Sequence, residues 1–401
     1  MSKTKAALWT PQFIVMSAIN FLLIVIFYLL MVTIGKFAIS EYGATTSQVG
    51  LVTGIYIIGT LLGRLFTGRV IEQIGRKRVL LFGLLFFIAT TGLYFIHAGI
   101  ILLLVCRLVH GIGVGVASTA TGTIVAQILP PSRKGEGIGY FAMSATLGTA
   151  IGPFIGLSMV QHTTYSVIFM MCMIIGIISF LLAVFTKVPG AESTTVVQPT
   201  EKSKGSFISQ YIELKAMPIA IVTFLMCFGY AAILSFISLF AKERNLEVAS
   251  SYFFIVYAIA VLLTRPVTGK MLDRFGGNSV MYPCFIFFGT GLILMSFAHS
   301  AFILLLAGIL IGIGYGNLSS GAQALAIKLT PPQRMGLATS TYFIALDAGL
   351  GVGPYLLGYV IPVFGYSVLY ISLGIFIFVL ILLYYVVYGK RERMLKVSQL
   401  S

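Results

Sequence analysis

The sequence predicts an all-α membrane protein with twelve transmembrane helices in two six-helix pseudo-repeats. Three observations predict this fold: the composition, a series of long apolar runs, and an internal repeat. Apolar residues make up 58% of the 401 residues, and charged residues only 9%. A soluble protein carries about 25% charged residues, so the composition excludes an ordinary soluble enzyme.

Twelve apolar runs are long enough to cross a bilayer, which takes about 20 helical residues. In chain order they are expected at about 13–35, 49–67, 79–97, 100–129, 137–160, 166–186, 218–240, 251–268, 280–298, 301–329, 338–361 and 367–388. The longest polar stretch, 187–215, is expected to be a cytoplasmic linker because it is rich in Pro, Ser, Thr and Lys. It divides the chain into an N-terminal bundle, 1–186, and a C-terminal bundle, 216–401.

The positive charge follows membrane topology and does not indicate a nucleic-acid partner. The chain has 26 Lys and Arg against 11 Asp and Glu, a net charge of +15. Three of these cations fall in loops of one face, one lies inside a span, and the other twenty-two border the opposite face. Cytoplasmic loops carry such an excess. We therefore expect a multi-pass protein of the cell membrane with both termini in the cytoplasm.

A shift of 201 residues aligns the two halves without a gap over more than a hundred residues. Two parallel helical units related by an axis along the membrane normal are an architecture of transporters that rock around a central site. We therefore expect a transporter that works as a monomer, with a small-molecule substrate and the lipid bilayer as its partners. The shift pairs Tyr56 with Tyr257, Arg64 with Arg265, Gly111 with Gly312, and Pro153 with Pro354.

Two cytoplasmic loops carry matching sets of glycine, acidic and basic residues. The glycines permit a tight turn between antiparallel helices, and a carboxylate can pair with the basic residues or with a helix N-terminus. We expect a latch that holds the cytoplasmic side closed in one state; charge that serves topology alone is the alternative. The residues are Gly68, Glu72, Gly75, Arg76 and Lys77 in the first loop, and Gly269, Asp273 and Arg274 in the second.

The first of these loops, from Gly68 to Arg78, resembles the G-x-x-x-D-R-x-G-R-K loop motif of the major facilitator superfamily. Glu72 replaces the Asp of the motif, and Gln73 replaces its first Arg. With the twelve spans and the repeat, the chain resembles this superfamily over essentially its whole length. The resemblance implies the fold described above and a transport function.

The fifth span resembles the motif that marks antiporters among the exporters of the superfamily. Its Gly148, Gly152 and Gly156 are four residues apart, so they line one helix face for tight packing. Pro153 frees a backbone carbonyl and favours a bend. Leu157 stands where the motif has its final glycine. Helix packing without any bearing on the direction of transport is the alternative.

The fourth span contains Arg107 and His110, followed by three glycines at alternate positions, which resembles the family's R-x-x-x-G-x-G-x-G motif. A charged side chain inside a bilayer costs about 2.5–3.5 kcal/mol, so Arg107 must face a cavity or a partner. An Arg bonded to backbone carbonyls is the alternative. His110 shares its helix face and could relay a proton or contact cargo; a packing histidine is equally consistent with the sequence.

Asp347 is the one acidic residue well inside a span, and its repeat position holds Thr146. Burial favours the neutral acid and a nearby cation opposes it, so this carboxyl is the candidate proton carrier. A structural Asp that caps or bridges helices is the alternative.

The resemblance implies a secondary active exporter of small molecules driven by proton antiport, for multidrug or endogenous metabolite efflux. The alternatives are an exporter of an opine-type metallophore such as staphylopine, and a proton-coupled importer of sugars or organic acids. The sequence contains no P-loop, metal-ligand spacing or nucleophile motif. We therefore expect no enzymatic activity, no cofactor and no metal site.

Overall fold

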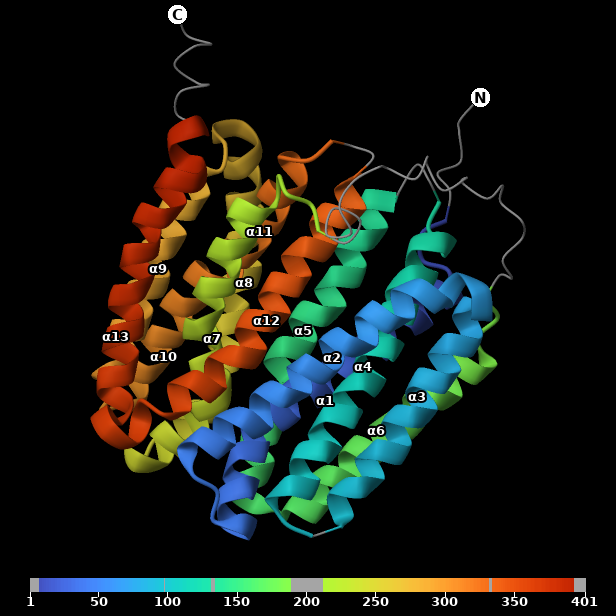
Figure 1. Ribbon diagram of the computed structural model, residues 1–401, viewed down its shortest axis with the longest axis horizontal. Coiled ribbons are helices and arrows are strands. Elements are labelled where there is room, and N and C mark those ends of the chain that lie inside the picture. Colours follow the sequence, from blue (N-terminus) through green and yellow to red (C-terminus); the bar gives the residue numbers. More distant parts are fainter. Residues whose placement is uncertain (1–6, 97, 131–133, 189–211, 332–333, 393–401) are drawn as a thin grey trace, which may run out of the picture. The chain divides into compact units, whose positions relative to one another are not determined.

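The computed structural model describes residues 7–96, 98–130, 134–188, 212–331 and 334–392, whose regular elements are all helices (Figure 1). The contacts divide the chain into two compact units. Unit 1 comprises Met1–Ala44 and Ile55–Pro199, and unit 2 comprises Thr45–Gly54 and Thr200–Ser401. Residues 189–211 of the expected linker lie outside the described part. The division at 187–215 therefore stays a prediction.

Unit 1 is a bundle in which α1 packs against α5, α4 and α6, while α3 packs against α4 and α6. Thr10 caps the first helix by accepting a hydrogen bond from the Phe13 amide (3.2 Å). Its core joins α1 side chains such as Met16 and Leu23 to Leu84 and Ile124. The elements are α1 (Pro11–Tyr42), α2 (Thr46–Ile74, whose part up to Gly54 belongs to unit 2), α3 (Arg76–Gly92), the 3₁₀ turn η1 (Leu93–Phe95), α4 (Ile100–Ile128), α5 (Lys134–His162) and α6 (Tyr165–Phe185).

Unit 2 repeats this pairing, because α7 packs against α12 and α13, while α9 packs against α10 and α13. One span is interrupted at its middle by a π-helical turn, η4. The elements are α7 (Met217–Glu243), α8 (Glu247–Phe275), α9 (Asn278–Ser296), α10 (Ala301–Ile311), η4 (Gly312–Gly316), α11 (Asn317–Lys328), α12 (Met335–Gly358), α13 (Ile361–Tyr384) and the π-helical η6 (Tyr385–Gly389).

Eleven helical segments of the described residues are long and apolar enough to cross a membrane. The remaining predicted span, about 338–361, corresponds to α12, which is a helix but falls outside this set. Its Asp347 and Pro354, together with several glycines and hydroxyl residues, lower its mean hydropathy. The structure therefore confirms the predicted all-helical membrane fold, with one span more polar than the rest.

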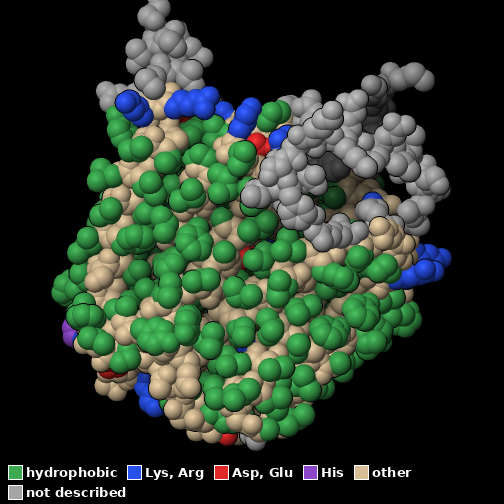
Figure 2. Space-filling model, viewed as in Figure 1, with side chains coloured by type: hydrophobic (Ala, Val, Ile, Leu, Met, Phe, Trp, Pro, Cys, Tyr) green, Lys and Arg blue, Asp and Glu red, His purple; other side chains and the backbone are tan. Residues whose placement is uncertain are grey.

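The side chains on the outer surface of the helices are mostly apolar, as expected for contact with lipid. Figure 2 shows hydrophobic side chains over the visible helical surface. Large apolar residues such as Ile101, Leu263 and Phe302 are more than 70% exposed. A soluble monomer rarely exposes apolar surface on this scale, whereas hydrocarbon is the natural solvent for it.

Two buried carboxylates of unit 2 stabilise backbone at helix ends through an ion pair and hydrogen bonds. Glu213, just before α7, is buried and pairs with Arg334 Nε at 2.8 Å, while its amide donates to Thr341 Oγ1 (2.8 Å). Glu392, after η6, accepts hydrogen bonds from the amides of Gly277 (2.6 Å) and Asn278 (2.7 Å). Because these amides open α9, the Glu392 carboxylate caps that helix.

Candidate functional site

Unit 1 contains a cation enclosed by aromatic and sulfur groups. Arg107 on α4 is completely buried, and its guanidinium carbon lies 3.9 Å from the centre of the Tyr56 ring of α2. Nη1 donates to the Tyr94 hydroxyl (3.4 Å), and Nη2 lies 3.8 Å from Met31 Sδ of α1. The cation–π contact offsets part of the cost of burying the charge.

His110 is joined to this cluster through Tyr94, as its position one turn from Arg107 predicts. The Thr91 hydroxyl donates to the Phe87 carbonyl (2.8 Å), so it accepts from His110 Nε2 (3.0 Å). A neutral ring then has a bare Nδ1, which accepts from the Tyr94 hydroxyl (3.0 Å). With the ring neutral, the hydrogen bonds run from Arg107 through Tyr94 to His110. Both ring nitrogens of His110 thus have a hydrogen-bond partner, and its role as a proton relay or as a packing histidine stays a prediction.

Three glycines of α4 bring the neighbouring helices close to the cluster. A Cβ at Gly111 would overlap the Tyr56 carbonyl of α2, and one at Gly113 would lie 3.1 Å from the Phe87 backbone of α3. The His110 ring therefore stacks near Phe87, with ring centres 4.4 Å apart. The R-x-x-x-G-x-G-x-G spacing positions the side chains by letting backbones touch.

Asp347 lies in the middle of α12 in unit 2 and is only 5% exposed. Its carboxyl is close enough to the Cys227 thiol and the Tyr342 hydroxyl to interact with them electrostatically. Tyr342 is also hydrogen-bonded to Ser319 on α11 (2.7 Å). The predicted proton carrier is thus held between α7, α11 and α12.

A stack of tyrosines lies beside Cys227, one of the residues near this carboxyl. Tyr315, in the π-helical turn η4, stacks on Tyr230 of α7 with ring centres 4.1 Å apart, and Tyr230 stacks on Tyr257 of α8 at 5.6 Å. The Tyr315 hydroxyl lies 3.6 Å from Cys227 Sγ. Two residues after Tyr315, the Asn317 side-chain amide donates to the Ile313 carbonyl (2.9 Å). This hydrogen bond gives a partner to a carbonyl of the π turn, where the regular α-helical hydrogen bonds are interrupted.

The glycines of the antiporter-type motif meet α1 along a continuous seam. A Cβ at Gly148 would lie 2.6 Å from the Ile24 side chain, one at Gly152 2.5 Å from the Val25 carbonyl oxygen, and one at Gly156 2.9 Å from the Leu29 carbonyl oxygen. Pro153 lies inside α5 beside them. The expected single packing face is present, and Gly349 of α12 makes the corresponding contact with Phe224 of α7.

The cytoplasmic-loop prediction is partly wrong about the turns. Gly75 (φ 98°) and Gly276 (φ 79°) make the turns that follow α2 and α8, but Gly68 and Gly269 lie within those helices, because each helix continues for more than a turn beyond them. A Cβ at Gly269 would meet nothing within 4 Å. The first loop is held instead by Lys77, whose Nζ donates to the Val184 carbonyl (2.9 Å).

The proposed latch lies mostly outside what the structure describes. The side chains of Glu72 and Asp273 are not among the described ones, and Arg274 is exposed. Arg76 begins α3 and is half-buried. The latch therefore stays a prediction.

Sequence reasoning missed Tyr94, which contacts Arg107 and His110, and the pair Tyr230 and Tyr315, which stack beside Cys227. The repeat offered a signal only for two of their neighbours, Tyr56 and Tyr257, which fall on the same repeat position. Among the described residues, no group of three or more His, Cys, Asp or Glu could hold a metal ion.

The chain has the features of a multi-pass membrane transporter. Its helices pair in the same way in both units, its outer surface is apolar, and ionisable groups are buried inside its spans. The sequence profile of the Major Facilitator Superfamily matches residues 16–262 and 249–399. The chain belongs to this family, whose activity is transport and not catalysis.

Known relatives agree with this assignment. The uncharacterized MFS-type transporter MJ1560 of Methanocaldococcus jannaschii is 24% identical over 83% of this chain and 87% of its own length. The uncharacterized MFS-type transporter YhhS of Escherichia coli is 28% identical over 82% and 81%. The crystal structure of a bacterial homologue of the human lysosomal transporter Spinster shares the fold, with a TM-score of 0.79, 13% identity and coverage of 96% and 98%.

Proposed function

We propose that this protein exports small organic molecules across the cell membrane in exchange for protons, as a monomer with both termini in the cytoplasm. The observation that carries the proposal is the α1–α5 seam, where Gly148, Gly152 and Gly156 all meet α1. The glycine spacing is the one that resembles superfamily antiporters. A seam of backbone contacts lets the two helices move as one body when the transporter changes state.

Asp347 supplies the proton step in this proposal. Its carboxyl is nearly enclosed, and the Cys227 thiol and the Tyr342 hydroxyl are among its neighbours, so a proton that it carries is shielded from water while the site is closed. Opening the site to water on the other side would favour release of the proton. Alternate loading and release on the two sides would couple proton entry to export of the cargo.

The first experiment identifies the cargo and the direction of transport. Metabolites secreted by a deletion strain and its parent are compared, which separates an endogenous metabolite or opine-type metallophore from a drug-only exporter. The compound is then offered to inside-out vesicles whose lumen is acidified. An exporter accumulates it in these vesicles at the expense of the proton gradient. Accumulation only in right-side-out vesicles would instead establish the importer.

The second experiment tests the coupling residue. Asp347→Asn should abolish gradient-driven accumulation while exchange of labelled for unlabelled cargo continues, because the amide imitates the protonated acid and cannot cycle. Glu243→Gln is the matched control, since Glu243 is 52% exposed at the end of α7. Normal gradient-driven transport by the Asp347 variant would remove the residue from the mechanism.

A further inference from the structure

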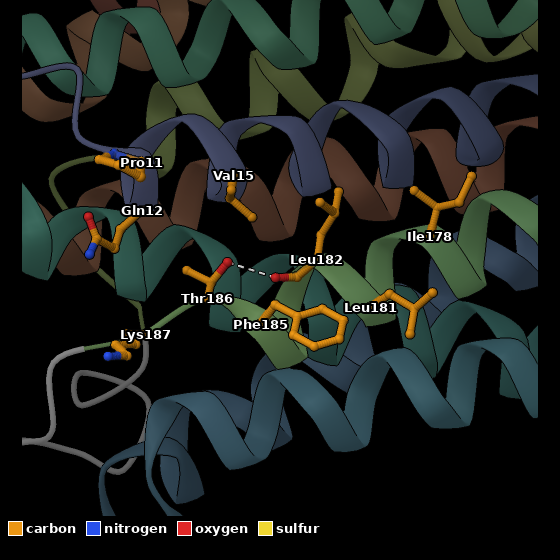
Figure 3. Close-up of a pocket in the computed structure, with 9 residues that line it drawn as sticks. All are labelled: Pro11, Gln12, Val15, Ile178, Leu181, Leu182, Phe185, Thr186 and Lys187. Carbon is orange, nitrogen blue, oxygen red and sulfur yellow. Dashed lines mark hydrogen bonds between the residues drawn. The ribbon is translucent and has the colours of Figure 1, made fainter.

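A groove of about 480 Å³ runs between the start of α1 and the last turns of α6, within unit 1 (Figure 3). Its wall is apolar over most of its length, with Val15, Leu182 and Phe185 among the lining side chains. Phe185 is 81% exposed. The groove therefore opens sideways from the helical surface, where hydrocarbon surrounds a transmembrane bundle.

The polar groups of the groove gather at one end. Figure 3 shows Gln12, Thr186 and Lys187 together at the end where α1 begins and α6 stops, while Ile178 and Leu181 lie toward the other end. The Thr186 hydroxyl donates to the Leu182 carbonyl (2.7 Å). Donors toward a ligand are thus the Gln12 amide and the exposed Lys187 ammonium group.

A second lysine adds positive charge at this end of α6. Lys77 Nζ donates to the carbonyl of Val184, which directly precedes the groove residue Phe185. Two ammonium groups therefore belong to one terminus of α6, where a membrane-spanning helix reaches the headgroup layer. Basic pockets between transmembrane helices at this depth attract anionic lipid headgroups.

We infer that this groove binds one anionic phospholipid, with an acyl chain along Val15 and Leu182 and the phosphate at Lys187. The apolar length with a cationic end matches the two chemically distinct parts of such a lipid. Charge complementarity distinguishes it from a zwitterionic lipid, because each nearby lysine enriches anionic lipid by roughly fivefold (~1 kcal/mol per basic residue). The inference is independent of the cargo and of the direction of transport.

The chain carries its own reporter for this site. Trp9 is the only tryptophan and is 57% exposed, two residues from the groove residue Pro11. Its ring lies 4.8 Å from that of Tyr140 on α5 and 5.6 Å from that of Phe13 at the start of α1. Brominated acyl chains quench tryptophan only at short range. The protein is reconstituted in phosphatidylcholine that contains either brominated phosphatidylglycerol or brominated phosphatidylcholine at the same low mole fraction.

Wild-type Trp9 should be quenched several-fold more by the brominated phosphatidylglycerol. Lys187→Gln, which removes one of the two charges, should reduce the difference about fivefold, and Val15→Phe, which fills the groove, should abolish it. Lys270→Gln removes an equal charge from the exposed end of α8 and should retain it.

Equal quenching by the two lipids in the wild type would overturn the inference, as would an unchanged preference in both groove variants. Loss of the preference on adding millimolar inorganic phosphate, with ionic strength held constant, would also overturn it, because the site would then bind free anions and not lipid.

Discussion

Gly152→Ala adds one methyl group at the tightest point of the seam between α5 and α1. The new Cβ would lie 2.5 Å from the Val25 carbonyl oxygen and 3.1 Å from the Leu29 amide nitrogen, where ordinary contact begins at 3.4 Å. Both obstacles are backbone atoms, which no rotamer change can move. The helices must therefore separate by about 0.9 Å, the difference between 2.5 and 3.4 Å.

The expected loss of stability follows from two opposing terms. Overpacking of this kind costs up to about 3 kcal/mol, and alanine is better than glycine in a helix by about 1 kcal/mol. Gly152→Ala should therefore be destabilised by about 2 kcal/mol. Gly122→Ala on α4 is the matched control, because its Cβ would meet nothing within 4 Å, and it should be neutral or slightly stabilised.

The measurement is reversible unfolding of the two variants and the wild type in one detergent, with transport measured on the same preparations. Gly148→Ala should fall between them, because its nearest obstacle at 2.6 Å is the Ile24 side chain and not the backbone. Equal stability of Gly152→Ala and Gly122→Ala would refute the reasoning, since it would mean that the seam is not in close contact.

Three further substitutions test the buried polar contacts, each by unfolding in detergent. Arg107→Lys replaces a planar cation over an aromatic ring and should cost about 2 kcal/mol; wild-type stability would show that the contact contributes nothing. Tyr94→Phe leaves the Nδ1 atom of His110 without its hydrogen-bond partner and should cost about 1–3 kcal/mol, and a smaller effect would show that this hydrogen bond contributes little to stability. Glu392→Gln weakens the cap on Asn278 and should cost about 1.5 kcal/mol, with faster hydrogen exchange at the start of α9; unchanged exchange would count against the cap.

Hydropathy and the repeat predict the fold because a bilayer imposes one simple demand, an apolar helix of sufficient length. The signal is weakest at α12, the predicted span 338–361, because Asp347 makes this helix more polar than the other spans. The prediction fails at Gly269, because a glycine reads as a turn in the sequence, while α8 continues to Phe275. Continuation depends on contacts that the sequence alone does not show.

The sequence predicts the ionisable residues of the candidate site, but it does not predict which aromatic residues contact them. Arg107 and His110 stand out because ionisable residues in apolar runs are rare. The chain has 20 tyrosines, so nothing in the local sequence singles out Tyr94 or Tyr315. Their roles depend on helix crossings that bring distant segments together.

The π-helical turn of Gly312–Gly316 sets the rotation of α11, the second half of this span, about the helix axis. Such a turn accommodates one residue more than an α-helical turn. If the extra residue were absorbed, everything beyond it would rotate by about 100° about the helix axis and advance by about 1.5 Å. Tyr315 would swing out of register with Tyr230, and Asn317 would lose the Ile313 carbonyl. This wider turn, at positions where the aligned first half forms the continuous helix α4, thus decides which side chains of α11 point toward the helix that carries Asp347.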